Sequence, residues 1–245
     1  MNTIGVIPAR WASSRLPGKS LIPICGKPLI QWVVERVSRA GLLTSFMVAT
    51  DDSRIRDVVE NLGFRAVMTS PDHPTGTDRI EEAVRGEDAD VVINIQGDEP
   101  LIDPGLIDCL AETMASRPEL DMATAATPFR DAAHLASPSV VKVVWNEVGE
   151  ALYFSRLPIP YVRDAADDID GLHWRHVGIY AYRREFLGRL VKMPPCALER
   201  AERLEQLRAL HIGARMAVVE TADEGIGVDT PEDVEYVERL LKNRD

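Results

Sequence analysis

The chain has 245 residues, of which 45% are hydrophobic, enough for one large α/β domain or a main domain with an insert. Its formal net charge of −11 argues against nucleic acid or an acidic membrane surface as the main partner. Because no apolar run approaches the roughly 18 residues of a membrane span, and no signal-peptide pattern opens the chain, we expect a cytoplasmic protein without a membrane partner. The three cysteines are widely spaced and show no CxxC pattern, which favours reduced thiols.

The first predicted strand, Ile4–Ile7, leads into an unusually long loop. The apolar run is short and β-branched and stops at Pro8, as expected for a strand buried on both faces. About nineteen residues then pass before the next periodic segment, where roughly two to six are usual. The loop holds the cations Arg10, Arg15 and Lys19 at the carboxyl end of a strand, where α/β sheets bind ligands. We interpret it as a grip for a polyphosphate; the alternative is an ordinary solvated loop.

The next predicted elements alternate between helix and strand. Apolar residues at helical spacing predict helices over 28–41 and 55–63, and short apolar runs predict strands over 46–49 and 66–68. This order favours right-handed crossovers, and therefore a Rossmann-like, mostly parallel sheet with helices on both faces. The loops that follow the strands then share one edge of the sheet.

A second polar loop, residues 69–79, also follows a strand and leads into a helix that we expect to begin near Asp78. Gly76 lets the backbone approach a ligand closely, and Arg79 adds a cation. The alternative is an ordinary helix-entry loop in which Thr77 or Asp78 is the cap.

The most apolar predicted strand, residues 91–95, runs into two adjacent acids. Asp98 and Glu99 repel one another unless a cation compensates them. Hard divalent cations such as Mg²⁺ prefer carboxylate and phosphate oxygens, so we predict Asp98 as a metal ligand. The alternative is that Asp98 caps a turn before the helix that opens at Pro104.

Residues 120–190 change character, because helical periodicity gives way to strand patterns. We interpret this region as a β-rich insert or sheet extension within a single domain of residues 1–245. The predicted strands are 122–127, 140–145, 151–154 and 177–182.

The last part of the chain returns to helical patterns. One amphipathic helix is predicted over Leu198–Leu210, followed by a strand over 215–219. Thr230 then caps a helix that begins at Pro231 and has Asp233 as its capping-box partner. Since Thr230 already supplies the cap, Asp229 is available for another role.

Seven motifs together resemble the 3-deoxy-manno-octulosonate cytidylyltransferases, also called CMP-Kdo synthetases. In chain order they are IPARWASSRLPGK (7–19), HPTGTDR (73–79), NIQGDEP (94–100), LYFSR (152–156), RHVGIYAY (175–182), LEQLR (204–208) and GVDTPED (227–233). The resemblance runs nearly end to end. Mild departures are Trp11, where that family more often has tyrosine, and a looser segment at 196–203.

The resemblance implies an enzyme that transfers CMP from CTP to the anomeric hydroxyl of 3-deoxy-D-manno-octulosonate (Kdo), releasing pyrophosphate, for lipopolysaccharide or capsule synthesis. It also implies a Mg²⁺-dependent homodimer, in which the β-rich portion contributes to dimerisation and sugar binding. The implied nucleotide-binding residues are Ala9, Arg10, Arg15, Lys19, Gly76, Arg79 and Gln96. The implied catalytic residues are Arg10, Arg15, Lys19 and Asp98, and the implied metal ligands are Asp98 and Asp229. The implied sugar-binding residues are Arg156, His176, Tyr180, Glu205 and Gln206.

Three other functions compete with this interpretation. The nearest is a cytidylyltransferase for a related acidic sugar, such as an amino-substituted Kdo or a sialic acid. A non-catalytic CTP sensor predicts the loss of a metal carboxylate, whereas both Asp98 and Asp229 are present. A nicotinamide-dependent dehydrogenase needs GxGxxG after the first strand, where this chain has Pro8, Ala9 and Arg10.

Overall fold

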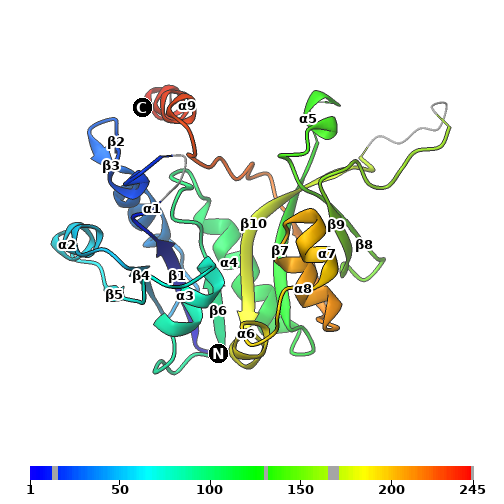
Figure 1. Cartoon of the computed structure of the whole chain (residues 1–245), viewed down its shortest axis with the longest axis horizontal. Helices are drawn as coiled ribbons and strands as arrows, with labels where there is room; N and C mark the ends of the chain where they lie inside the picture. Colours follow the sequence, from blue (N-terminus) through cyan, green and yellow to red (C-terminus); the bar gives the residue numbers. More distant parts are fainter. Residues whose placement is uncertain (13–15, 130–131, 165–170, 244–245) are drawn as a thin grey trace. The chain divides into compact units, whose positions relative to one another are not determined.

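The computed structural model describes residues 1–12, 16–129, 132–164 and 171–243, and the chain divides into two compact units (Figure 1). The first unit consists of Met1–Glu112 and Gly225–Asp245, and the second of Thr113–Glu224. The portion expected to be β-rich, residues 120–190, falls within the second unit.

The first unit is built on a parallel sheet in the order β6-β1-β4-β5. Its strands are β1 (Thr3–Ala9), β4 (Ser45–Thr50), β5 (Ala66–Met68) and β6 (Val91–Asn94). Strands β1 and β6 are almost entirely buried, as short apolar runs predict for strands covered on both faces. The predicted alternation of strand and helix is confirmed in this unit.

Helices cover both faces of this sheet (Figure 1). They are α1 (Leu29–Val37), α2 (Ser53–Asn61), α3 (Gly76–Ala83) and α4 (Pro104–Ser116), whose last turn belongs to the second unit. Helix α9 (Pro231–Lys242) does not cover the sheet, and its Val237 packs in a hydrophobic cluster with Ile24 and Leu29. Right-handed crossovers place α1 and α2 on one face, because β1, β4 and β5 follow one another in one direction. The return from β5 to β6 reverses that direction and therefore places α3 on the other face.

Two local predictions in this unit need correction. The long loop after β1 is not without regular structure, since it contains a 3₁₀ helix, η1 (Lys19–Leu21), and a small hairpin of β2 (Pro23–Ile24) and β3 (Lys27–Pro28). Helix α3 begins at Gly76, and its cap is Thr75, whose hydroxyl accepts a hydrogen bond from the Asp78 N–H at 3.3 Å. Thr75 is the N-cap, rather than Thr77 or Asp78, because its backbone is extended, as the N-cap position requires.

The second unit is a mixed sheet in the order β11-β7-β10-β8-β9. Its strands are β7 (Met122–Pro128), β8 (Lys142–Trp145), β9 (Ala151–Ser155), β10 (Trp174–Arg183) and β11 (Met216–Glu220). Only β11 and β7 run parallel among these neighbours, so the region is β-rich, as expected. Its helices are α5 (Ala132–Ala136), α6 (Arg184–Leu190), α7 (Ala197–Glu202) and α8 (Gln206–His211).

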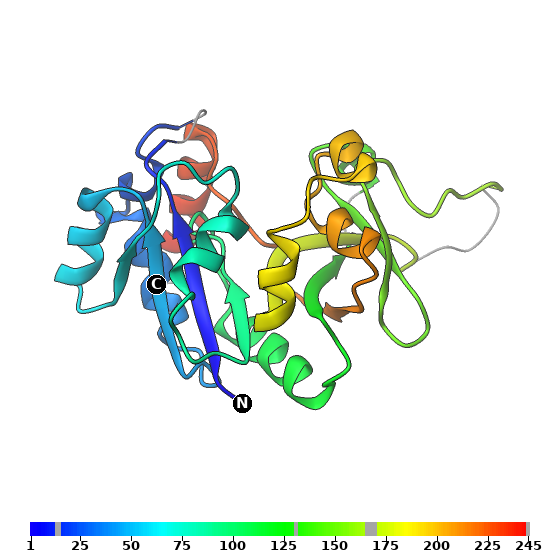
Figure 2. The same ribbon diagram turned by 60° about the horizontal axis from the view of Figure 1, so that its bottom comes forward.

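The prediction of a single helix over Leu198–Leu210 is wrong, because the chain forms two short helices there. Figure 2 shows α7 and α8 as separate helices in the amber and orange part of the chain. The break is at Arg203, which is left-handed with φ 54° and ends α7 by donating its N–H to the Glu199 carbonyl at 2.7 Å. The apolar spacing of the two helices runs through the break, which is why the sequence pattern suggests one helix.

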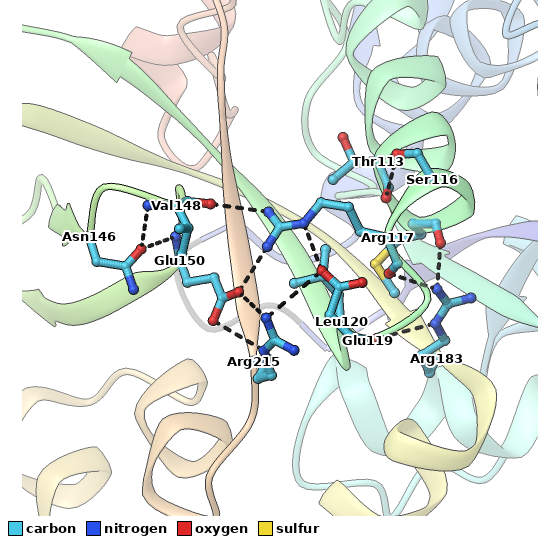
Figure 3. Close-up of polar contacts among 11 residues, drawn as sticks. Thr113, Ser116, Arg117, Glu119, Leu120, Asn146, Val148, Glu150, Arg183 and Arg215 are labelled. Atoms are coloured by element: carbon cyan, nitrogen blue, oxygen red, sulfur yellow. Dashed lines mark hydrogen bonds and ion pairs between the residues drawn. The ribbon is translucent and has the colours of Figure 1, made fainter.

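An ion-pair network, which we call the arginine–glutamate brace, ties three segments of the second unit together (Figure 3). It consists of Arg117, Glu119, Glu150 and Arg215. The Glu150 carboxylate lies 2.8 Å from the Arg117 guanidinium and 2.7 Å from that of Arg215, and Arg117 also donates to Glu119 at 3.0 Å. These contacts fix the turn between β8 and β9 against the segments that follow α4 and precede β11.

Two expectations about the whole chain can be compared with the structure. No disulfide forms among the described residues, which include all three cysteines, in agreement with the predicted reduced thiols. Within the same residues, the structure contains no helix that is both long and apolar enough to cross a membrane.

Candidate active site

Eight residues expected at the nucleotide and metal sites lie around one cavity of about 320 Å³ in the first unit. Strands β1 and β6 are neighbours in the sheet, so the segments that follow them meet at the same edge. The expected residues that line the cavity are Ala9, Arg10, Lys19, Gly76, Arg79, Gln96, Asp98 and Asp229. The remaining expected cation, Arg15, lies outside the described residues.

Lys19 stands between two carboxylates at this cavity. Its Nζ lies 2.6 Å from Asp98 Oδ2 and 2.9 Å from Asp229 Oδ1. Burial acts to lower the pKa of the Lys19 ammonium, but the charges and hydrogen bonds of Asp98 and then Asp229 outweigh it, so this pKa is raised. Lys19 is therefore positively charged at neutral pH, and its charge holds the two acids together.

The backbone brings Asp229 to Asp98 through the start of α9. The Val228 N–H donates to the Asp98 carbonyl at 2.9 Å, which fastens the two segments directly. The predicted capping box is confirmed, since the Thr230 hydroxyl accepts from the Asp233 N–H and the Asp233 carboxylate accepts from the Thr230 N–H. The Asp233 carboxylate also accepts from the Asp229 N–H at 2.9 Å, so the cap fixes the backbone of Asp229.

The donor set at this point fits a hard divalent cation such as Mg²⁺. Two carboxylates from different segments converge on one position, and that position is held by the Lys19 ammonium. Magnesium sites at phosphate-transfer centres commonly use one or two carboxylates and complete their shell with substrate phosphates and water. Among the described residues no group of three or more metal-ligating side chains occurs, so a closed all-protein metal cage is not present there.

A close backbone approach narrows the floor of the cavity. A side chain added at Gly97 would place its Cβ 2.6 Å from the Pro8 carbonyl oxygen, which is closer than such atoms approach in proteins. The glycine therefore lets the segment after β6 lie against the end of β1. Further lining residues that the sequence reasoning did not single out are Pro8, Ser20, His73, Pro74 and Gly97.

Asp51, which sequence reasoning missed, links two walls of the cavity. Its Oδ2 accepts a hydrogen bond from the Arg79 guanidinium at 2.9 Å, and its Oδ1 accepts one from the Trp11 N–H at 3.1 Å. Arg79 is only 3% exposed, so its charge is compensated inside the protein by Asp51. The Arg54 guanidinium stacks 3.3 Å from the centre of the Trp11 ring and further fixes this part of the loop. Asp51 directly follows strand β4. An acidic residue after a strand is the same sequence feature that pointed to Asp98 after β6, so it could have identified Asp51.

Three of the expected sugar-binding residues lie close together in the second unit. His176 Nε2 is 2.9 Å from the Thr124 hydroxyl, and the His176 ring lies 5.4 Å from that of Tyr180. Burial, and secondarily the charge of Arg175, lowers the pKa of His176 to about 3, so its imidazole is neutral at physiological pH. Burial also raises the pKa of Tyr180 well above its ordinary value, with a contribution from the charge of Glu205. Gln206 is buried beside Glu205 at the start of α8.

Arg156, the remaining expected sugar-binding residue, donates its guanidinium hydrogen bonds to the backbone. Its Nε donates to the Glu202 carbonyl at 2.6 Å, its Nη1 to the Pro138 carbonyl at 2.9 Å, and its Nη2 to the Arg203 carbonyl at 3.4 Å. The Glu202 carboxylate accepts the Arg156 N–H at 3.0 Å and the Ser155 hydroxyl at 2.9 Å. Arg156 therefore holds the break between α7 and α8 in place, directly before Glu205. The sequence reasoning missed Glu202 because it lies in what the pattern suggested was a continuous helix.

Known proteins of one enzyme family resemble this chain over nearly its whole length. The family model described as "Cytidylyltransferase" matches residues 4–219. A 3-deoxy-manno-octulosonate cytidylyltransferase of Geobacter sulfurreducens is 50% identical over 99% of this chain and 100% of its own length. One from Bdellovibrio bacteriovorus is 48% identical over 100% of this chain and 99% of its own length.

Solved structures show the same fold. A CMP:2-keto-3-deoxy-manno-octonic acid synthetase complexed with CTP superimposes with a TM-score of 0.95 at 45% identity, and each chain is covered to 100%. A cytidylyltransferase from Leptospira borgpetersenii, at 18% identity and a TM-score of 0.64, shares the fold alone. The predicted nucleotidyltransferase-type α/β fold is thus confirmed. The chain is a nucleotidyltransferase of the cytidylyltransferase family and belongs to its 3-deoxy-manno-octulosonate cytidylyltransferases.

Proposed function

We propose that this enzyme transfers CMP from CTP to the anomeric hydroxyl of Kdo, giving CMP-Kdo and pyrophosphate. The observation that carries the proposal is the convergence of Lys19, Asp98 and Asp229 on one cavity at the carboxyl edge of the parallel sheet. Full-length similarity to enzymes named for this reaction, one of them solved with CTP bound, supports the choice of both substrates.

The proposed chemistry follows from where charge develops. The sugar hydroxyl attacks the α-phosphorus of CTP in line and a new O–P bond forms, while the hydroxyl proton is released to solvent. The bond to pyrophosphate breaks, and its electron pair leaves on the pyrophosphate. Negative charge therefore grows on the leaving group and on the non-bridging oxygens. Arg10 and Lys19 line the cavity and neutralise that charge, and the family resemblance adds Arg15.

The remaining lining residues bind the rest of the nucleotide. The base and ribose contacts assigned by resemblance are Ala9, Gly76, Arg79 and Gln96, and all four line the cavity. The Arg79 guanidinium donates a hydrogen bond to the Asp51 carboxylate, so it is already orientated before the nucleotide binds. Such preorganisation lowers the cost of binding.

We propose that Asp98 and Asp229 bind Mg²⁺ when the nucleotide is present. The bound ion supplies positive charge beside the phosphate oxygens. Lys19, which holds both carboxylates, keeps their oxygens gathered at one point and prevents the two acids from repelling one another apart.

The second unit is proposed to bind the sugar through Arg156, His176, Tyr180, Glu205 and Gln206. A His176 imidazole with a pKa of about 3 is a poor proton acceptor, so we assign it a hydrogen-bonding role rather than that of a general base. The implied homodimer is supported by large apolar side chains exposed on and after β9, namely Leu152 (59%), Leu157 (69%) and Tyr161 (86%). The reaction is placed in the cytoplasm, where CTP is made, and its product serves lipopolysaccharide or capsule synthesis.

The proposal is tested by pyrophosphate release from the purified enzyme with Mg²⁺, all four nucleoside triphosphates and a panel of acidic sugars. We expect turnover with CTP and Kdo, and formation of CMP-Kdo confirmed by mass. A higher kcat/KM for an amino-substituted Kdo or a sialic acid would instead support the related-sugar alternative. Nucleotide binding without turnover of any sugar would support a CTP sensor.

A further inference from the structure

Lys142 is the largest fully buried side chain in the described part of the chain, and the proposed reaction does not use it. It begins β8 and is 0% exposed. Its Nζ donates to the carbonyls of Ser137 at 2.7 Å, Val140 at 2.8 Å and Arg156 at 2.8 Å. A neutral amine has only two donors, so three carbonyl acceptors require the charged ammonium form. Burial, and then the charge of Arg156, lowers the pKa of Lys142, which shows that this charge is held at a cost.

Lys142 and Arg156 form a pair of cations that is bound mainly by backbone carbonyls. Each donates to three carbonyls, and the acceptors come from the loop before β8, the end of β9 and the break between α7 and α8. Carbonyls satisfy hydrogen bonds but carry no net charge. The Glu202 carboxylate lies beside this pair, where it accepts the backbone N–H of Arg156 rather than contacting either charged group. Among the described residues, therefore, neither the Lys142 ammonium nor the Arg156 guanidinium is neutralised by an ion pair.

A further cation lies beside this pair. Arg175 is directly opposite Lys142 in the pairing of β10 with β8, so the two side chains project from the same face of the sheet. The charge of Arg175 also acts on His176, one of the expected sugar contacts. In a chain of net charge −11, a buried ammonium and a neighbouring guanidinium that make no ion pair among the described residues need a separate explanation.

We propose that Lys142 is a positioning residue that fixes Arg156 and, together with it, supplies the positive potential by which the second unit selects an acidic sugar. The inference rests on the proposed function, since it concerns the sugar half of that reaction. It explains why a buried ammonium is kept where an apolar side chain would cost less to bury. The chemical class selected is a sugar that carries a carboxylate next to its anomeric carbon.

Lys142 acts on the sugar without touching it. All three of its donors are used, and the side chain is fully buried. Its influence reaches the substrate in two ways: through the carbonyl of Arg156, which it holds, and through its charge, which is weakly screened inside the protein. If Lys142 had only a structural role, its loss would weaken the binding of every sugar equally.

The decisive measurement compares Kdo with its neutral carboxamide. With CTP saturating, the KM for Kdo and the inhibition constant of the carboxamide are measured for the wild type and for Lys142→Met. We expect Lys142→Met to lose about tenfold of the preference for the carboxylate, as the removal of one weakly screened charge predicts, while the KM for CTP stays unchanged. Equal losses for both ligands, or an unchanged preference, would overturn the inference.

A second variant, Glu202→Gln, tests the same idea with the opposite sign. Glutamine keeps the shape of Glu202 and an oxygen that accepts the backbone N–H of Arg156, but it removes a negative charge that lies beside the cation pair. We therefore expect the preference for Kdo over its carboxamide to rise. A preference that stays the same or falls would contradict the inference, and this arm decides the question if Lys142→Met does not fold.

Arg117→Met is the matched control in the same unit. Arg117 also makes three hydrogen bonds, to Glu119, Val148 and Glu150, in the brace at the turn end of the β8–β9 hairpin (Figure 3). Lys142 pairs with Ser155 at the other end of that hairpin. Arg117→Met is expected to leave the carboxylate preference unchanged, and a change equal to that of Lys142→Met would show that loosening of the unit is the cause. A wild type that forms no CMP-Kdo would refute the proposed function instead.

Discussion

The two units of this enzyme use their buried cations in different ways. In the first unit, Lys19 is bound by two carboxylates at the edge of an open cavity, where phosphate oxygens can replace or join them. In the second unit, Lys142 and Arg156 donate chiefly to backbone carbonyls, which cannot leave without disturbing the chain. The first arrangement is suited to exchange with a charged ligand, and the second to holding a backbone conformation.

This difference separates two ways of building a site. Carboxylates that are held by a lysine at the edge of a sheet can exchange partners when a triphosphate and a metal ion bind and dissociate. Carbonyls that two cations collect from three segments hold one backbone conformation in place. Substitutions in the first unit should therefore act chiefly on turnover and nucleotide binding, and those in the second on recognition of the sugar.

The largest effect is expected for Asp98→Asn and Asp229→Asn. Each removes one of the two carboxylates proposed to bind Mg²⁺, and loss of one preorganised charge contact typically costs about 2.7–4 kcal/mol, or about 10²–10³ in kcat. Pyrophosphate release with saturating CTP, Kdo and Mg²⁺ measures it. The exposed Asp57→Asn on α2 is the control and should be active. A near-normal rate in either active-site variant would remove that residue from the metal site.

A second large effect is expected when the ion pair behind the cavity is broken. Arg79 is 3% exposed and Asp51 11%, and removal of one partner of a buried pair typically costs about 3–5 kcal/mol. We therefore expect Asp51→Ala to lower the free energy of unfolding in urea by this order and to raise the KM for CTP. The double variant Asp51→Ala with Arg79→Met should recover much of the stability but not the affinity for CTP. If the double variant is as unstable as the single one, the pair is not the cause.

Where the sequence predicts well, the signals are local. Apolar runs gave the strands of the parallel sheet, and Thr230 with Asp233 gave the start of α9, because each pattern is complete within a few residues. The position of Asp98 at the sheet edge could be anticipated as well, since it follows a predicted strand of the parallel sheet. Asp229 follows β11, a strand of the second unit, so strand order alone does not bring it to Asp98; the Val228–Asp98 hydrogen bond and the start of α9 do.

Where the prediction fails, the cause is a contact between segments far apart in the chain. The break at Arg203 has no glycine or proline to announce it, and it is held by the Arg156 guanidinium from the end of β9. The Asp51–Arg79 ion pair could not be predicted for the same reason. The position of Asp51 after a strand suggests a polar role, but it does not show that Arg79 is its partner. The carbonyls around Lys142 likewise come together only when the second unit has folded.

A smaller effect, confined to the sugar, is expected for Arg156→Met. The variant keeps most of the apolar stem but frees the carbonyls of Pro138, Glu202 and Arg203, so the start of α8 loses its support. We expect the KM for Kdo to rise by about tenfold, which corresponds to roughly one charge-assisted hydrogen bond, with the KM for CTP unchanged. An equal rise in the KM for CTP would break the contrast between the two units.

The smallest effect at neutral pH concerns His176. In the folded protein its pKa is lowered from 6.5 to about 3, whereas the unfolded chain keeps the ordinary value. Between these two pH values the unfolded state binds more protons, so the contribution of His176 to stability is complete above about pH 6.5 and is lost as the pH falls towards 3. His176→Gln, which stays neutral, should therefore flatten the fall in the free energy of unfolding between pH 7 and pH 5 while changing little at pH 7 beyond its local packing. If His176→Gln leaves the pH dependence of the free energy of unfolding unchanged, the His176 imidazole is not held neutral by burial. The contrast with the first unit, where the charged Lys19 faces the cavity, would then be lost.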